Sequence, residues 1–261
     1  MRLKKNLFSK YHENLKLGQK LTFILLSIFV MGSILCGLVL SNYLNYTSQR
    51  EITFQAKILM NTMNSVRNYT SLQIQPQLDD RLDQIFLPQT VPAYSATEVF
   101  NQFRASPEFG QFYYKEATLN PTNPRDQADD FETQIIEQFK QSNNLKFLQG
   151  FRQTSNGETV FYSARPLRVN SSSCLECHSD PSIAPLSMIR KYGQEGGFGW
   201  YLDKIVGAQV LSAPASTVIE GARQSFFWIM LIVVGIFGLV LFTVNYWLRK
   251  NVISPMYQQI F

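Results

Sequence analysis

The chain of 261 residues has a mass of 30.0 kDa, is 45% hydrophobic and 16% charged, and carries a formal net charge of +5. Its apolar residues are concentrated in two uncharged runs, residues 21–40 and 226–248. At a rise of about 1.5 Å per residue, either run can cross a hydrocarbon core of about 30 Å as a helix. The two runs exclude a soluble cytoplasmic enzyme, and we expect no enzymatic activity from the chain by itself.

The basic residues are concentrated beside the two apolar runs. Residues 1–20 and 249–250 carry a net charge of +7, which leaves −2 for the rest of a chain whose total is +5. By the positive-inside rule, both termini are predicted to be cytoplasmic and the long loop to lie outside the cytoplasm. The pI of about 9.0 therefore reflects membrane topology, so the expected partner is a lipid bilayer and not a nucleic acid.

A cleaved signal peptide is the alternative interpretation of the first run. The run is longer than the apolar part of such a peptide, about 7 to 15 residues, and no A-x-A pattern follows it. We therefore predict a retained anchor and five segments. A cytoplasmic basic tail (1–20) precedes a first transmembrane helix (21–40), and an outer domain (41–224) follows. A second transmembrane helix (225–248) then leads to a cytoplasmic tail (249–261).

The outer domain shows helical patterns first and strand patterns afterwards. Residues 51–70 are expected to continue the first membrane helix, Ser95 and Glu98 to form a capping box, and Asp129 or Asp130 to cap another helix. A proline-rich turn at residues 120–124 separates these two helices. Three strands are predicted after these helices, at residues 146–151, 159–169 and 205–211. A hairpin turn at Asn156-Gly157 connects the first two. This order predicts an α+β domain inserted between two transmembrane helices.

The motif that carries chemistry is Cys174-Leu-Glu-Cys177-His178. This spacing is typical of c-type haem, in which two thiols add to the haem vinyl groups and the next histidine reaches the iron. The motif predicts one covalent haem c, attached through Cys174 and Cys177, with His178 as the proximal iron ligand. Cys36 lies inside the first apolar run and is expected only to pack there.

A disulfide, a thioredoxin-like redox pair and a zinc site are the alternatives for this motif. A structural zinc site needs four ligands, and the loop holds no further cysteine or histidine beyond these three. A redox pair usually opens a helix after a strand, whereas this motif follows a run of serines and precedes a segment predicted to be a loop. These alternatives are weaker than haem but stay open.

The second axial position on the iron has several candidates. His12 is predicted to lie on the other side of the membrane, so a second histidine from the same chain is excluded. Met60 and Met63 share a helix face and could supply a thioether, although packing in the core would explain them equally. Met188 follows His178 too closely to reach the opposite haem face readily. An open position is the remaining alternative.

Basic residues near the motif are candidates for the haem propionates. Arg165 and Arg168 precede the motif by a few residues, and a guanidinium matches a carboxylate with two hydrogen bonds. Solvated surface arginines are the alternative interpretation. Arg67 and Tyr192 belong to the same class of candidate contacts.

The order of these features resembles a known family of bacterial, including cyanobacterial, extracytoplasmic c-haem domains with a PAS-like fold. The resemblance covers nearly the whole loop and rests on short motifs, those at residues 66–70, 91–94, 120–124, 164–167, 174–178, 192–193, 197–200 and 207–209. It implies a PAS-like sheet, haem attachment at Cys174 and Cys177, His178 as proximal ligand, and a distal residue from the N-terminal helix.

Relatives in this family often continue into a HAMP helix pair and a kinase or cyclase. Here, residues 252–256 resemble the start of such a HAMP segment. The expected partner is a second copy of the chain in a homodimer, or a membrane protein with a cytoplasmic output. The expected location is a bacterial inner membrane or a thylakoid membrane, with the haem domain in the periplasm or lumen.

The leading functional hypothesis is a sensor of redox state or of a small diatomic ligand that signals through the second membrane helix. This hypothesis requires two states whose populations differ with haem oxidation or ligation. An electron-transfer haem subunit of a larger membrane complex, for example a photosynthetic one, is the rival hypothesis. A PAS-like module without haem is the third.

Overall fold

The computed structural model describes residues 17–82, 84–154, 156–248 and 250–251. The predicted HAMP-like segment, His12 and the basic residues before residue 17 lie outside these ranges. The chain divides into two compact units, the first made of Met1–Ser48 with Ile219–Phe261 and the second of Gln49–Val218.

Two long helices carry the apolar runs. They are α2 (Leu17–Tyr69) and α7 (Ser216–Leu248), and among the described residues they are the two helices long and apolar enough to cross a membrane. Within the first unit they touch: Thr22 donates a hydrogen bond of 2.6 Å to Asn245, and the rings of Phe29 and Phe237 lie 5.4 Å apart. This unit is compatible with a two-pass membrane protein.

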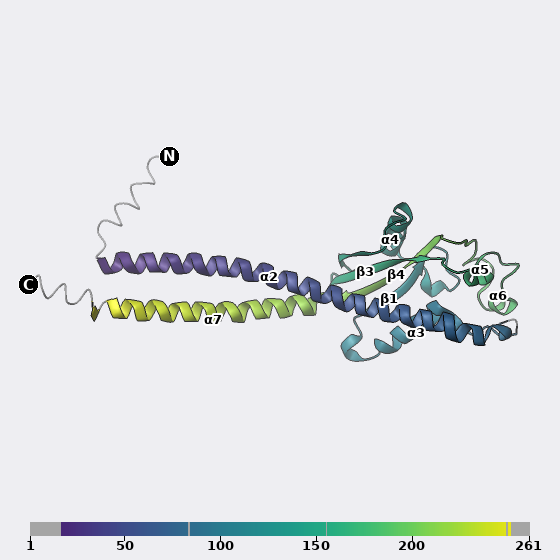
Figure 1. The fold of residues 1–261 in the computed structure, drawn as a ribbon, viewed down its shortest axis with the longest axis horizontal. Helices are drawn as coiled ribbons and strands as arrows, with labels where there is room; N and C mark the ends of the chain where they lie inside the picture. The colour runs from purple at the N-terminus through teal and green to yellow at the C-terminus, as the bar shows by residue number, and fades with distance from the viewer. Residues whose placement is uncertain (1–16, 83, 155, 249, 252–261) are drawn as a thin grey trace, which may run out of the picture. The chain divides into compact units, whose positions relative to one another are not determined.

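The second unit contains one antiparallel sheet of four strands in the order β1-β4-β3-β2 (Figure 1). The two ten-residue strands, β3 (Thr159–Arg168) and β4 (Ile205–Pro214), lie in the middle, and the shorter β1 (Tyr113–Thr118) and β2 (Leu148–Gln153) lie at the edges. The predicted hairpin joins β2 to β3, and Gly157 there adopts a φ of +80°, which a glycine tolerates well. The α+β class is confirmed.

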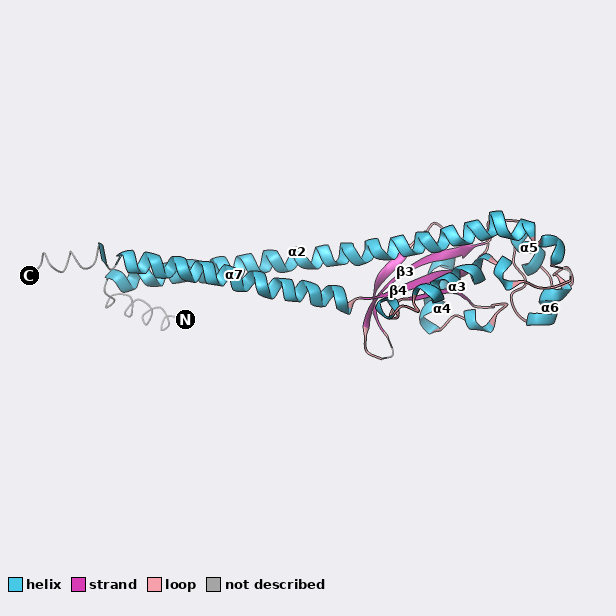
Figure 2. Ribbon diagram, turned by 90° about the horizontal axis from the view of Figure 1, so that it is seen from below, coloured by secondary structure: helices cyan, strands magenta, loops and turns pink. Residues whose placement is uncertain are grey.

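Helices cover both faces of the sheet (Figure 2). On one face α2 and α3 (Pro92–Phe103) pack through a buried cluster that includes Met60, Phe100, Phe161 and Leu211. On the other face α4 (Asp130–Gln141) packs its apolar stripe against the two central strands, through Ile135, Ile136, Phe139, Ala164, Ala208 and Val210. The core therefore consists of two apolar layers separated by the sheet.

The ends of the helices test the predicted caps. Asp129 caps α4 as expected and forms a reciprocal capping box with Glu132. The predicted box of Ser95 and Glu98 is wrong, because α3 begins three residues earlier, at Pro92. Proline suits the first helical position, and the hydroxyl of Ser95 instead donates to the carbonyl of Gln89 at 2.8 Å.

Two further elements differ from the expectations. Strand β1 was not predicted, because its buried positions include the polar residues Glu116 and Thr118 and so break the usual apolar alternation. The cysteine motif, for which no helix was predicted, forms the short helix α5 (Ser173–His178). The remaining short helix, α6 (Leu186–Tyr192), follows it, and these two helices lie near one end of the second unit (Figure 1).

Candidate functional site

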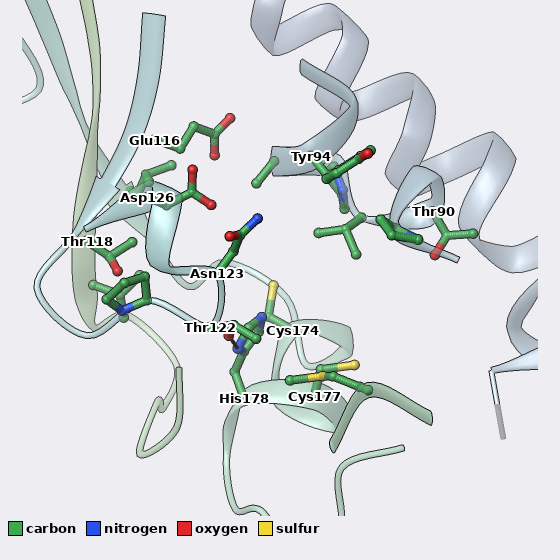
Figure 3. Close-up of a pocket in the computed structure, with 18 of the residues that line it drawn as sticks. Thr90, Tyr94, Glu116, Thr118, Thr122, Asn123, Asp126, Cys174, Cys177 and His178 are labelled. Carbon is green, nitrogen blue, oxygen red and sulfur yellow. Dashed lines mark hydrogen bonds between the residues drawn. The ribbon is translucent and has the colours of Figure 1, made fainter. Parts of the chain in front are cut away.

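Helix α5 brings the three motif residues to one cavity. Cys174 and Cys177 are three residues apart, a spacing that places two side chains on the same face of a helix. Both cysteines are free thiols of intermediate exposure, and both line the cavity together with His178 (Figure 3). The cavity encloses about 220 Å³ and is lined entirely by residues of the second unit.

Three contacts hold the imidazole of His178 in one orientation. Its Nδ1 lies 2.7 Å from the carbonyl oxygen of Gly197 and 3.4 Å from the hydroxyl of Thr122. Its ring stacks on the indole of Trp200, with centroids 3.9 Å apart and planes inclined by 16°. Because the carbonyl can only accept, Nδ1 carries the proton, and the lone pair of Nε2 is free to bind a metal.

Glycine at position 197 makes this arrangement possible. Its φ of +85° lies in the left-handed region, and a Cβ there would sit 1.9 Å from the hydroxyl oxygen of Thr122. The neighbouring Gly196 packs equally closely, since a Cβ there would sit 2.3 Å from the carbonyl oxygen of Pro121. The segment before Trp200 and the proline-rich turn at residues 120–124 therefore meet beside His178.

Burial favours the neutral forms of His178 and Cys177. Desolvation lowers the pKa of His178, against the opposing effect of its hydrogen bond to Gly197, so the imidazole is uncharged at neutral pH. Desolvation also raises the pKa of Cys177 to about 11. A reactive redox cysteine needs a lowered pKa, so this environment disfavours the thioredoxin-like alternative.

The cavity has one largely apolar wall and one polar wall. The apolar side chains come from several segments of the second unit and include Leu82, Phe86, Pro88, Val91, Leu167, Met188 and Val206. The polar wall lies across the cavity from the motif and includes Glu116, Asn123 and Asp126 (Figure 3). A flat, mostly apolar group with a polar edge matches such walls.

A buried network supports the polar wall. Glu116 is 3% exposed, pairs with Arg67 of α2 and accepts a hydrogen bond of 2.7 Å from the hydroxyl of Tyr114. Gln209 of β4 donates to the same hydroxyl at 3.2 Å and to Asn64 of α2 at 2.9 Å. The network therefore joins α2, β1 and β4 directly behind the cavity.

Asp126 also lines the cavity, with a side chain 21% exposed. Desolvation raises its pKa to about 6, with a further upward contribution from Glu116, while Arg125 opposes the shift. Arg125 itself donates to Glu98 of α3 at 2.6 Å and lies over the ring of Tyr94, 4.7 Å from its centroid.

The structure brings some of the expected contact residues to the cavity and leaves others out. Arg67, Arg168 and Tyr192 line it. Arg168 is also held by the backbone carbonyl of Asp203, at 2.8 Å. Arg165 is not among the lining residues, and its guanidinium lies instead over the ring of Phe147, 6.0 Å from the centroid.

The three candidate methionines are distributed differently from the expectation. Met60 and Met63 are 0% and 3% exposed in the core between α2 and the sheet, and neither is among the cavity-lining residues. Met60 lies two turns and Met63 one turn before Arg67 on the same helix face, so the helix reaches the cavity only after them. Met188 of α6 does line the cavity, although it follows His178 by only ten residues.

Sequence reasoning missed most of the residues that orient the motif. Thr122, Gly197 and Trp200 belong to short motifs noted for the family resemblance, but spacing alone gave them no role. Glu116 and Asp126 carried no signal, since an isolated acid is usually a solvated surface residue. Their position in the cavity depends on pairing between distant strands.

The donor set fits a haem. Two free thiols on one helix face, an oriented neutral imidazole with a free Nε2, and a mostly apolar cavity are what such a group requires. Cys174 and Cys177 would hold the porphyrin edge, and His178 would hold the iron.

Replacing Gly197 by alanine is expected to release the imidazole, because the added methyl group collides with Thr122 and the backbone strains at its positive φ. Nitrogen NMR of the His178 ring should then lose the signature of a protonated, hydrogen-bonded Nδ1. Gly199→Ala is the matched control, since Gly199 has a φ of +76° but open space around its Cβ. An unchanged ring signal in Gly197→Ala would contradict this account.

Asp126→Asn is expected to stabilise the second unit above about pH 6. The pKa of Asp126 is raised from 3.8 to about 6 in the folded chain, so wild-type stability should fall as the pH rises between these values. The free energy of unfolding of the wild type should fall by at most about 3 kcal/mol over this range, and that of Asp126→Asn should not show this fall. Denaturant unfolding at acidic and neutral pH measures it, with the exposed Glu137→Gln as control. Parallel pH profiles of wild type and Asp126→Asn would refute the prediction.

Comparison with known proteins supports the predicted family. The Tll0287-like family model matches residues 45–214. The crystal structure of the cyanobacterial haem protein Tll0287 is similar with a TM-score of 0.49 and 15% identity, over 63% of this chain and 95% of that chain. No curated protein matches. Because the family model covers more than half of the sequence, the chain belongs to the Tll0287-like family.

Proposed function

We propose that the chain is a membrane-anchored c-type haem protein that registers redox state or a small diatomic ligand and signals through α7. The observation that carries this proposal is the convergence of Cys174, Cys177 and a fixed, neutral His178 on one cavity. Haem in the cavity would supply one-electron chemistry and an iron able to bind ligands. The protein has no enzymatic activity of its own in this proposal.

Covalent attachment is supported by the geometry of α5. The two thiols share a helix face and a cavity, and the histidine follows directly on the same helix. The raised pKa of Cys177 argues against a free thiolate that would serve as a redox centre. One haem per chain follows from the single Cys-x-x-Cys-His motif in the sequence.

The proposed domain is PAS-like and is inserted between the two membrane helices. Its antiparallel sheet and its membership in the family support the PAS-like assignment. The positive flanks of the apolar runs support a location outside the cytoplasm for this domain, in the periplasm or the thylakoid lumen, with both termini cytoplasmic. Its partners are the bilayer and either a second copy or a membrane protein with a cytoplasmic output.

A short covalent route supports signalling. Strand β4 ends at Pro214 and α7 begins at Ser216, so a single residue, Ala215, separates them. Ala215 is fully buried, and its amide donates to the carbonyl of Thr159 at 3.3 Å. A shift of β4 would therefore be passed to α7 without loss in a flexible linker.

Electron transfer is the second candidate function. The observation that favours it is Met188, whose thioether lines the cavity and could occupy the second axial position. Histidine and methionine ligation raises the potential of a haem and closes it to external ligands. An open position would instead favour the sensor.

Mass spectrometry of the full chain from native membranes tests haem attachment. We expect the added mass of one haem, and we expect Cys174→Ser with Cys177→Ser to abolish it because no thioether bond can form. Cys36→Ser is the matched control, since Cys36 lies in the apolar part of α2. Wild-type protein without the added mass, or a double variant that keeps it, would refute the proposal of covalent haem.

A redox titration with and without carbon monoxide separates the two functions. A sensor should bind the gas in the ferrous state and change the spacing of cross-links between α7 helices or between α7 and a partner. Met188→Leu should leave this spectrum unchanged if the axial position is open, and should create gas binding if methionine occupies it. Identical cross-links in every redox and ligand state would contradict the sensor.

A further inference from the structure

The two carboxylates that line the cavity have different surroundings. Glu116 is almost fully buried, and its two oxygens are taken up by Arg67 and by the hydroxyl of Tyr114. Among the described residues, the polar contact of the Asp126 side chain is with Nε of Arg125, at 3.4 Å from Oδ1. Asp126 therefore keeps unused acceptor capacity in a partly desolvated place, whereas Glu116 is fully compensated.

The charges around Asp126 leave it poorly stabilised as an anion. Arg125 lies on its own turn and shares its guanidinium with Glu98. The other charged or titratable groups that act on it or line the same cavity wall come from β1, α2 and α6, namely Glu116, Lys115, Arg67 and Tyr192. Arg67 is already paired with Glu116, and Lys115 is held by the buried Glu132 at 2.8 Å.

Asp126 shares its cavity with the residues that would hold the haem. Both it and His178 line the same space, and Thr122, four residues before Asp126, touches Nδ1 of His178 (Figure 3). Reduction of the iron removes one positive charge from this space. Charges interact more strongly in a desolvated cavity than in water, so a nearby carboxylate becomes easier to protonate after reduction.

We propose that Asp126 is a redox-linked proton acceptor of the haem cavity, a role that rests on the proposed function. One electron, from a low-potential one-electron donor, converts ferric to ferrous iron. One proton from solvent converts the Asp126 carboxylate to the carboxylic acid, so the net charge of the cavity is unchanged. On oxidation, the iron passes the electron to a one-electron acceptor, and Asp126 releases the proton to solvent.

The pKa of Asp126 is about 6 in the chain without haem, so this exchange falls on the acidic side of neutral pH. Ferric iron lowers that pKa through its positive charge, and reduction raises it again. Between the two values, proton uptake should accompany electron uptake. A sensor built in this way responds to the acidity of its compartment as well as to its redox state.

Redox titration of the full haem-loaded chain, from about pH 4 to about pH 8, tests this role. The midpoint potential of wild type should fall with rising pH over part of the range, approaching one proton per electron, or about 59 mV for a tenfold change in proton concentration. Asp126→Asn should abolish this slope. Glu137→Gln removes an equivalent charge from an exposed residue that does not line the cavity, and it should retain the slope.

Infrared difference spectra between reduced and oxidised protein give a second readout. A protonated carboxyl band should appear on reduction in wild type and in Glu137→Gln, and should be missing from Asp126→Asn. If Asp126→Asn fails to load haem, Arg125→Gln serves instead. Loss of the opposing Arg125 charge should move the sloping region of the potential to higher pH.

The outcomes are distinguishable. The assignment of Asp126 would be overturned if the wild-type potential did not depend on pH. It would also be overturned if Asp126→Asn kept the slope, as it would if a haem propionate titrated instead. Either result would leave the haem function intact. A sloping region that stays at the same pH in Arg125→Gln would also overturn the assignment. Wild-type protein without haem would refute the proposed function and this role together.

Discussion

The hydrogen bond between Nδ1 of His178 and the carbonyl oxygen of Gly197 is the interaction on which the site depends. It fixes the tautomer, leaves Nε2 for a metal, and requires a glycine whose backbone is left-handed and pressed against Thr122. Stacking on Trp200 then fixes the plane of the ring. The amide of Trp200 also donates to the carbonyl of His178 at 3.1 Å, so the loop is tied to the end of α5.

The buried pair of Arg67 and Glu116 has a different role. Burying two charges is costly, and the cost is offset only when each charge keeps good partners. Here the hydroxyl of Tyr114 supplies a partner on one side, and Gln209 extends the network to Asn64. The network joins helix α2 to strand β4. Helix α2 itself contains the first apolar run, and β4 ends one residue before the second apolar helix, α7.

Residues that are close in sequence were easier to assign than residues that only the fold brings together. The cysteine motif, the helix cap at Asp129 or Asp130 and the hairpin at Gly157 depend on local geometry, and each was predicted from neighbouring residues. Strand β1 escaped because Glu116 and Thr118 are polar and yet buried. Helix α3 begins at Pro92, before the predicted capping box at Ser95, because both residues are suitable for a helix start and the local sequence does not decide between them.

The sequence by itself determined the two apolar helices, the α+β class and the three residues of the motif, because periodicity, charge and short spacing are properties of neighbouring residues. The tertiary structure decided which distant residues surround the motif. It placed Met60 and Met63 in the core, Arg165 outside the cavity and Met188 in its wall. Those positions depend on the strand register and on how far along α2 the sheet ends, and these follow from the packing of the whole domain.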